Sequence, residues 1–276
     1  MPDATAPASG YDRFAAEYER WWLPVLATAT LGLLDRLPPD LGRDDRTLVD
    51  VGSGTGILPV AALRRWPRLR AVAVDASSGM LELARAAAVA AGDGVASRLE
   101  TRVADAAELP LADRSADVVT SSFMIQLVPD RAAVLSEVLR VLRPGATFAG
   151  VTWRSGELPF EPEEVFFDVV DDLGIDVPES GPQPEPYESA AAAADELRAA
   201  GFVEVTAGDE WLQRQWRPVD YLDLLEYWTA DDVFAPLADE RRVRLRDETL
   251  RRFGRLPHRD FAWRAPLVSF RGTRPD

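Results

Sequence analysis

The chain has 276 residues, 47% of them hydrophobic, and a formal net charge of −15 at neutral pH, which is enough apolar material for one globular domain with its own core. It contains no cysteine, and this excludes a disulfide framework, a thiolate nucleophile and a zinc–thiolate centre. The acidic charge argues against DNA or RNA as a partner, and no apolar run reaches the length of about eighteen residues that a membrane span needs, so we expect a cytoplasmic protein with no membrane partner.

The first 45 residues are predicted to form an N-terminal helical cap. Aromatic residues recur in this region at helical spacing, which is typical of the packing face of an amphipathic helix. They are Tyr11, Phe14, Tyr18, Trp21 and Trp22.

The strongest local signal is the segment TLVDVGSGTG at residues 47–56. A short apolar strand leads there into three glycines at alternate positions, Gly52, Gly54 and Gly56. Glycine permits a backbone with positive φ and a closer approach of a ligand than a Cβ allows. An apolar helix is predicted to begin at Ile57, so its N-terminus would face the ligand. This strand, turn and helix predict a site for a nucleotide-like ligand.

Two carboxylates near the turn restrict which kind of nucleotide can bind there. Asp50 precedes the turn, where it would repel a pyrophosphate but hold an ammonium group through a charge-assisted hydrogen bond worth about 1.5–3 kcal/mol. Ile57 stands where a dinucleotide fingerprint has its last glycine, which makes NAD the weaker interpretation. The next strand, residues 71–74, ends at Asp75, a position where such folds place an acid on the ribose hydroxyls. The two acids favour a nucleotide that carries an amino acid.

With these residues in place, the chain resembles the class I S-adenosylmethionine-dependent methyltransferases, of the small-molecule type related to ubiquinone-biosynthesis methyltransferases, most clearly over residues 11–153. The resemblance implies an α/β, Rossmann-like fold with a seven-stranded, mostly parallel sheet, an antiparallel last strand and helical lid insertions. It implies S-adenosyl-L-methionine as the cofactor and S-adenosyl-L-homocysteine as its product. Gly52, Ser53 and Gly54 would line the methionine part, Asp50 would lie near its amino group, and Asp75 would bind the ribose.

The same resemblance implies further cofactor contacts. Residues after the second and third strands would meet the adenine, with an acid accepting from its exocyclic amine, and aromatic faces in the cap would attract the sulfonium cation. The residues at these positions, together with the end of the fourth strand, are Ala76, Met80, Asp105, Ala106, Ser121, Tyr11 and Tyr18. Met80 as a core residue, Asp105 as a strand-end cap and the tyrosines as packing residues are the structural alternatives.

Two residues are candidates for catalysis, and no metal is expected. Gln126 stands where relatives commonly carry histidine, but an amide cannot accept a proton at neutral pH. The single histidine, His258, precedes the last predicted strand, and a lone loop histidine is more often incidental. Holding the reactants in line contributes about 7–11 kcal/mol, against roughly 3–5 kcal/mol from a general base. Positioning alone can therefore suffice.

Residues 154–187 are predicted to form an acidic lid inserted after the fifth strand. The segment between positions 157 and 189 is rich in Asp and Glu and contains no arginine. A helix over residues 162–173 would turn an apolar face inward. Three interpretations of the acidic charge are open: it attracts a cationic substrate, it forms a solvated face, or it pairs with the arginine-rich helix of residues 238–253.

The remainder, residues 188–276, is predicted to complete one domain whose cofactor-binding core is residues 46–153. An alanine-rich helix stops at Gly201, a long strand ends near Trp216, and a last strand lies near residues 263–270. Between the last two strands, a helical substrate-side insertion is expected at about residues 217–260.

Three functions are compatible with this sequence. We prefer a methyltransferase that acts on oxygen, nitrogen or carbon of a small aromatic or polycyclic metabolite, as in natural-product biosynthesis, because aromatic residues gather in the insertions. A cyclase on the same fold would bind the cofactor without consuming it. A non-catalytic protein would use the acidic lid to recruit a basic partner. A small-molecule substrate is the expected partner, and a homodimer is left open.

Overall fold

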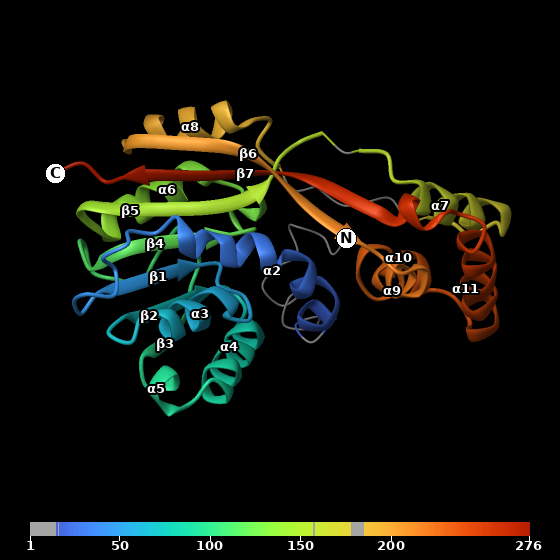
Figure 1. Ribbon diagram of the computed structural model, residues 1–276, viewed down its shortest axis with the longest axis horizontal. Helices are drawn as coiled ribbons and strands as arrows, with labels where there is room; N and C mark the ends of the chain where they lie inside the picture. The colour runs from blue at the N-terminus through green and yellow to red at the C-terminus, as the bar shows by residue number, and fades with distance from the viewer. Residues whose placement is uncertain (1–14, 16, 157, 178–184) are drawn as a thin grey trace.

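The computed structural model describes residues 15, 17–156, 158–177 and 185–276. Seven strands form one sheet in the order β3-β2-β1-β4-β5-β7-β6, and Figure 1 shows the strands running across the view one above another. All pairs are parallel except those of β7 with β5 and with β6. The predicted mostly parallel sheet with a reversed last strand is therefore confirmed. The strands are β1 (Thr47–Val51), β2 (Arg70–Asp75), β3 (Leu99–Val103), β4 (Ala116–Ser122), β5 (Leu142–Trp153), β6 (Val203–Gln215) and β7 (Ala262–Thr273).

Helices cover both faces of the sheet, as a buried parallel sheet requires. Alternate residues of β1 point to opposite faces, so Leu48 joins the hydrophobic cluster under α2 and α3 while Val49 joins the cluster under α6 and α8. The helices around the sheet are α2 (Leu23–Gly32), α3 (Ile57–Arg65), α4 (Ser78–Ala90), α5 (Asp93–Ala96), α6 (Arg131–Val141) and α8 (Ala190–Ala199). A five-residue π-helix, η1 (Tyr18–Trp22), leads directly into α2. In the described part of the chain, no helix is both long and apolar enough to cross a membrane.

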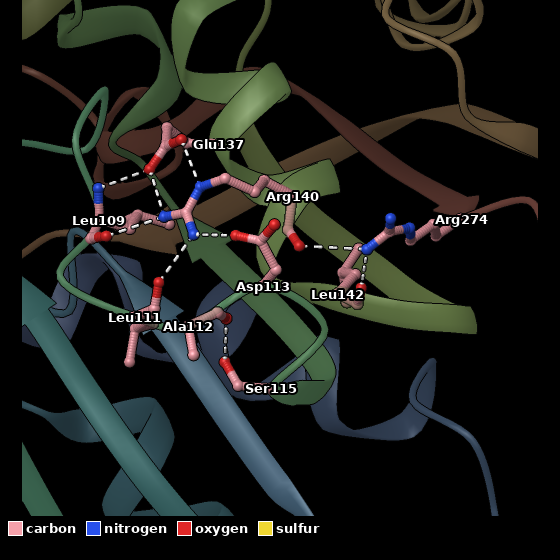
Figure 2. A network of polar contacts seen from close by, with 9 residues as sticks. All are labelled: Leu109, Leu111, Ala112, Asp113, Ser115, Glu137, Arg140, Leu142 and Arg274. Carbon is pink, nitrogen blue, oxygen red and sulfur yellow. Dashed lines mark hydrogen bonds and ion pairs between the residues drawn. The ribbon is translucent and has the colours of Figure 1, made fainter.

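One arginine fixes the connection between β3 and β4. Arg140 of α6 donates to the carbonyl oxygens of Leu109 and Leu111 at 2.9 and 2.7 Å, and it forms ion pairs with Glu137 and Asp113 (Figure 2). Glu137 in turn accepts the Leu109 N–H at 2.8 Å. The later part of the loop between β3 and β4 is thereby anchored to the C-terminal end of α6.

Strands β6 and β7 run past the rest of the sheet as a two-stranded ribbon. Leu267 of β7 pairs with Trp153 at the end of β5, whereas Ala262 pairs with Gln215 at the end of β6. The five residues 262–266 extend the ribbon beyond Leu267 by about 17 Å at about 3.4 Å per residue. Figure 1 shows it leading to a separate group of helices, which we call the helical insertion: α7 (Glu161–Asp172), α9 (Pro218–Leu224), η4 (Leu225–Thr229), α10 (Asp231–Phe234), α11 (Asp239–Phe253) and η5 (His258–Phe261).

The acidic segment after β5 packs inside this insertion. Helix α7 buries Phe166, Val169 and Val170, and the Phe166 ring stacks on Phe234 of α10 at 5.8 Å. At its end, Asp172 forms an ion pair with Arg252 of α11. The pairing of the acidic segment with the arginine-rich helix is thus present in the structure. The outer acidic residues of α7 still form a solvated face, since Glu163, Glu164 and Asp168 are among its exposed positions.

Candidate functional site

The glycine turn after β1 is held against the end of β2. The N–H groups of Gly52 and Ser53 both donate to the Val74 carbonyl oxygen, at 2.8 and 3.0 Å. Gly52, Gly54 and Gly56 have φ values of +69°, +53° and +79°, the left-handed region in which glycine carries no Cβ penalty. The turn therefore depends on glycine at all three positions.

The three glycines differ in what surrounds them. A Cβ on Gly52 would overlap the Met124 side chain, and a Cβ on Gly56 would lie 2.7 Å from the Ala84 Cβ. A Cβ on Gly54 would meet no atom of the described residues within 4 Å. Gly52 and Gly56 are therefore required by packing, whereas Gly54 presents bare backbone to open space, where a ligand could approach. We call this glycine turn, together with Asp50 and Asp75, the cradle.

The carboxylate at the end of β2 is fixed beside this turn. Asp75 accepts the Gly54 N–H at 2.8 Å and the Ser77 N–H at 2.9 Å. These bonds fix the orientation of the carboxylate next to the open side of Gly54, and its role in binding a ribose stays a prediction.

The other carboxylate is buried at the end of β1. Asp50 is 2% exposed, and its Oδ1 accepts the Thr120 hydroxyl of β4 at 2.6 Å. Burial raises the pKa of Asp50 to about 7, against a lowering by the Thr120 hydrogen bond, and the nearby negative charge of Asp75 raises it further. A desolvated carboxylate of this kind is stabilised by a cation, so Asp50 is suited to bind an ammonium group.

A narrow cavity of about 30 Å³ opens at this turn. Its wall joins the turn to the N-terminal helices and to the end of β4, and comprises Tyr18, Leu23, Thr30, Asp50, Gly52, Ser53, Gly54, Thr55, Ile57, Leu58 and Ser122. One water needs about 10–15 Å³ of such space, so a nucleotide enters only when wall residues move. Thr30 and Ser122 close one side through a hydroxyl–hydroxyl hydrogen bond of 2.7 Å.

Three buried hydroxyls at this edge of the sheet make no hydrogen bond within the described part of the chain: those of Ser53, Thr55 and Ser121. A buried hydroxyl without a partner costs free energy, so their clustering around the cradle indicates a polar ligand. Ser53 and Ser121 were predicted as site residues. Thr55 was not, although its position between Gly54 and Gly56 was the signal available in the sequence.

The candidate adenine residues lie along the same edge. Val103 pairs with Asp75, which brings the loop after β3 beside the end of β2. Ala76 and Asp105 are exposed, Ala106 is half-buried, and Met80 is 2% exposed. The Asp105 carboxylate accepts the Ala107 N–H at 2.8 Å, as in the strand-end cap interpretation, and its adenine role stays a prediction.

The two candidate catalytic residues are placed very differently. Gln126 is 5% exposed, its Nε2 donates to the Phe123 carbonyl oxygen at 2.6 Å, and its Oε1 accepts the Thr152 hydroxyl. Both ends of its amide are therefore engaged. His258 is exposed in η5, within the helical insertion. The catalytic roles of both residues stay predictions, and Tyr11 lies outside the described residues.

One aromatic residue of the cavity wall, Tyr18, belongs to a series of packed rings that reaches the helical insertion. Tyr18 lines the cavity and also packs edge-on against Trp228 of η4, with ring centroids 5.5 Å apart. Successive ring contacts of 4.9 to 6.5 Å join η1, the ends of β4 and β5, η4 and the start of β7. We call this set the aromatic wall; it consists of Tyr18, Trp22, Phe123, Trp153, Trp228 and Trp263.

Comparisons with known proteins identify relatives of this chain. A family model described as a methyltransferase domain matches residues 49–150. The chain is 33% identical to a nocamycin O-methyltransferase of Saccharothrix syringae, over 71% of each chain. It is 41% identical to a ubiquinone/menaquinone biosynthesis C-methyltransferase of Dinoroseobacter shibae over 41% of this chain, but spans only 43% of that relative's length.

Solved structures share the fold. A Haemonchus contortus phosphoethanolamine N-methyltransferase 2, solved with S-adenosylhomocysteine, has a TM-score of 0.59 at 19% identity, covering this whole chain and 60% of its own. The [4+2]-cyclase SpnF has a TM-score of 0.60 at 16% identity, covering this whole chain and 98% of its own. At these identities the structures show a shared fold and no more. The family model, the shared fold and the relative that is 33% identical over 71% of both chains show that this chain belongs to the S-adenosylmethionine-dependent methyltransferases.

Proposed function

We propose that the protein transfers a methyl group to oxygen, nitrogen or carbon of a small aromatic or polycyclic metabolite in natural-product biosynthesis. The observation that carries this proposal is the aromatic wall, because Tyr18 belongs both to it and to the cofactor cavity. A flat acceptor held on these rings would lie next to the methionine end of the cradle. The similarity to an enzyme named as an O-methyltransferase supports oxygen among the three atoms.

The residues of the cradle fit the cofactor. Asp50 would pair with its ammonium group, Asp75 would accept from the ribose hydroxyls, and Gly54 leaves room for close approach of the ligand. The hydroxyls of Ser53 and Thr55 would find the hydrogen-bond partners that they lack among the described residues. When bound, S-adenosylmethionine supplies an electrophilic methyl group on a sulfonium. The rest of the cofactor is released as a neutral thioether, so the leaving group needs no acid.

The role of the protein would then be mainly to orient the acceptor. Gln126 is held by Phe123 and Thr152, which makes it suitable for fixing the loop after β4 rather than for moving a proton. His258 is exposed on the helical insertion. Orientation can contribute about 7–11 kcal/mol towards the barrier, and the closed wall around the cavity would exclude water during the transfer.

The test is incubation of the purified protein with methyl-labelled S-adenosylmethionine and a fractionated bacterial metabolite extract. We expect label in a small product whose mass has grown by one methyl group in place of a hydrogen, and none with the Asp75→Ala variant. A product of unchanged mass that forms only with cofactor present would favour the cyclase alternative. Failure to label any fraction, with the cofactor demonstrably bound, would contradict the proposal.

A further inference from the structure

A single arginine lies where the N-terminal helices, the β6/β7 ribbon and the aromatic wall meet. Arg214 of β6 pairs with Trp263 of β7, and directly opposed residues of antiparallel strands share one face. Its Nη1 donates to the carbonyl oxygen of Pro24 at 3.0 Å, and Pro24 follows Leu23 of the cavity wall. The guanidinium also lies 4.2 Å from the centre of the Trp216 ring. Arg214 thus lies beside the aromatic wall, where the proposed function places the acceptor.

Arg214 differs from the other arginines that are not fully exposed. Of those in the described ranges, only Arg98, Arg214 and Arg274 have no carboxylate within ion-pair distance. Arg98 donates four bonds to carbonyl oxygens, and Arg274 donates to two. Within the described residues, Arg214 makes a single hydrogen bond, although a guanidinium has five N–H donors.

The surroundings leave this cation undercompensated. Burial lowers the pKa of Arg214, and the carboxylate of Asp220 only partly opposes that effect. Asp220 is itself bound by Arg217 through two bonds of 2.6 and 2.7 Å. A partly desolvated cation is only partly compensated when its nearest carboxylate is already bound by another arginine, so an anion bound here would supply the charge that Arg214 lacks.

Resting on the proposed function, we propose that Arg214 determines specificity by binding a carboxylate of the acceptor. The planar guanidinium matches a carboxylate through two parallel hydrogen bonds, while the aromatic wall receives the apolar part of the same molecule. A chain with a net charge of −15 offers a doubly charged phosphate little compensation from one arginine, whereas a carboxylate needs only one positive charge. The acceptor class is therefore an aromatic or apolar acid.

The experiment compares acids with their neutral amides on protein saturated with S-adenosylhomocysteine. The probes are benzoate, 2-naphthoate and octanoate, each paired with its primary amide and titrated by quenching of tryptophan fluorescence. Since a hydrogen bond to a charged group is typically worth about ten- to hundredfold in affinity, at least one acid should bind about tenfold or more tightly than its amide. In Arg214→Gln that preference should fall to within about twofold.

Arg264→Gln is the matched control. Arg264 occupies the same ribbon next to Trp263 but lies over the ring of Trp211 at 4.6 Å, on a strand position that alternates with that of Trp263. It should keep the preference for acids. Calorimetric titration of S-adenosylhomocysteine on each sample reports whether the cradle is folded, and its affinity should be the same in all three proteins.

Two results would overturn the inference while leaving the proposed function intact. One is normal binding of S-adenosylhomocysteine with no acid preferred over its amide in the wild type. The other is a preference for acids that survives in Arg214→Gln. Failure of the wild type to bind S-adenosylhomocysteine would instead refute the proposed function, and this inference with it.

Discussion

Replacing Asp50 by asparagine tests the buried carboxylate of the cradle. Burial, opposed by the Thr120 hydrogen bond and aided by Asp75, raises the pKa of Asp50 from 3.8 to about 7 in the folded protein. Between these values the folded state keeps a proton that the unfolded chain has released, so the stabilisation is greatest at low pH and is lost as the pH rises towards 7. At about 1.36 kcal/mol per pH unit, the whole effect amounts to about 4 kcal/mol.

The assay is urea unfolding of the wild type and of Asp50→Asn across this pH range. Asparagine keeps an oxygen that can accept the Thr120 hydroxyl but has no charge to desolvate. Relative to the variant, the wild type should lose about 2 kcal/mol of unfolding free energy from about pH 5 to pH 7. The comparison cancels other titrating groups, so parallel curves for the two proteins would refute the assignment of the raised pKa.

The same pair of proteins tests the role of Asp50 in binding. The carboxylate meets the ammonium group of the cofactor only when it is ionised, so the affinity of the wild type for S-adenosylhomocysteine should rise with pH up to about 7. Asp50→Asn should bind about ten- to hundredfold more weakly, without this dependence. Equal affinities at neutral pH in calorimetry would place the ammonium group elsewhere.

Three further predictions follow from the same geometry. Asp75→Ala should abolish most cofactor binding in calorimetry, because the acid that orients towards both Gly54 and the ribose is lost, and an unchanged affinity would overturn that assignment. His258→Ala should leave the methyl-transfer rate nearly unchanged, and a loss of tenfold or more would make the exposed histidine functional. Gly52→Ala should lower the free energy of unfolding by about 1–3 kcal/mol through its clash with Met124, whereas Gly54→Ala should cost about 1–2 kcal/mol of backbone strain and weaken cofactor binding as well. Equal binding by the two glycine variants would contradict the open side of Gly54.

Local sequence patterns predicted the cradle because its chemistry depends on strand ends. The glycine turn, Asp50 and Asp75 all follow short apolar strands, and parallel strands bring their carboxyl ends to one edge. Strand lengths were predicted less well. The last strand was expected near residues 263–270 but runs from Ala262 to Thr273. Strand β5 begins as early as Leu142 because Leu142 pairs with Ala116 across an irregular register, and such a bulge has no marker in the sequence.

The aromatic residues show what sequence patterns cannot predict. The helical spacing of Tyr18, Trp21 and Trp22 indicated a packing face, and Trp22 is indeed buried. Its partners Trp153 and Trp228 lie more than a hundred residues away, and no local pattern relates them. Likewise, the place of Thr30 in the cavity wall depends on α2 lying against the end of β4.

The sequence by itself determined the fold family, the cofactor and the acids of its cradle, because those features are encoded within single strand–turn–helix units. Only the tertiary structure decided which residues form the aromatic wall. It placed η1 against η4, carried the helical insertion outward on the β6/β7 ribbon and left Arg214 beside the aromatic wall with one hydrogen bond among the described residues. These relations arise from packing between distant segments, where burial and charge compensation, not local propensity, determine the arrangement.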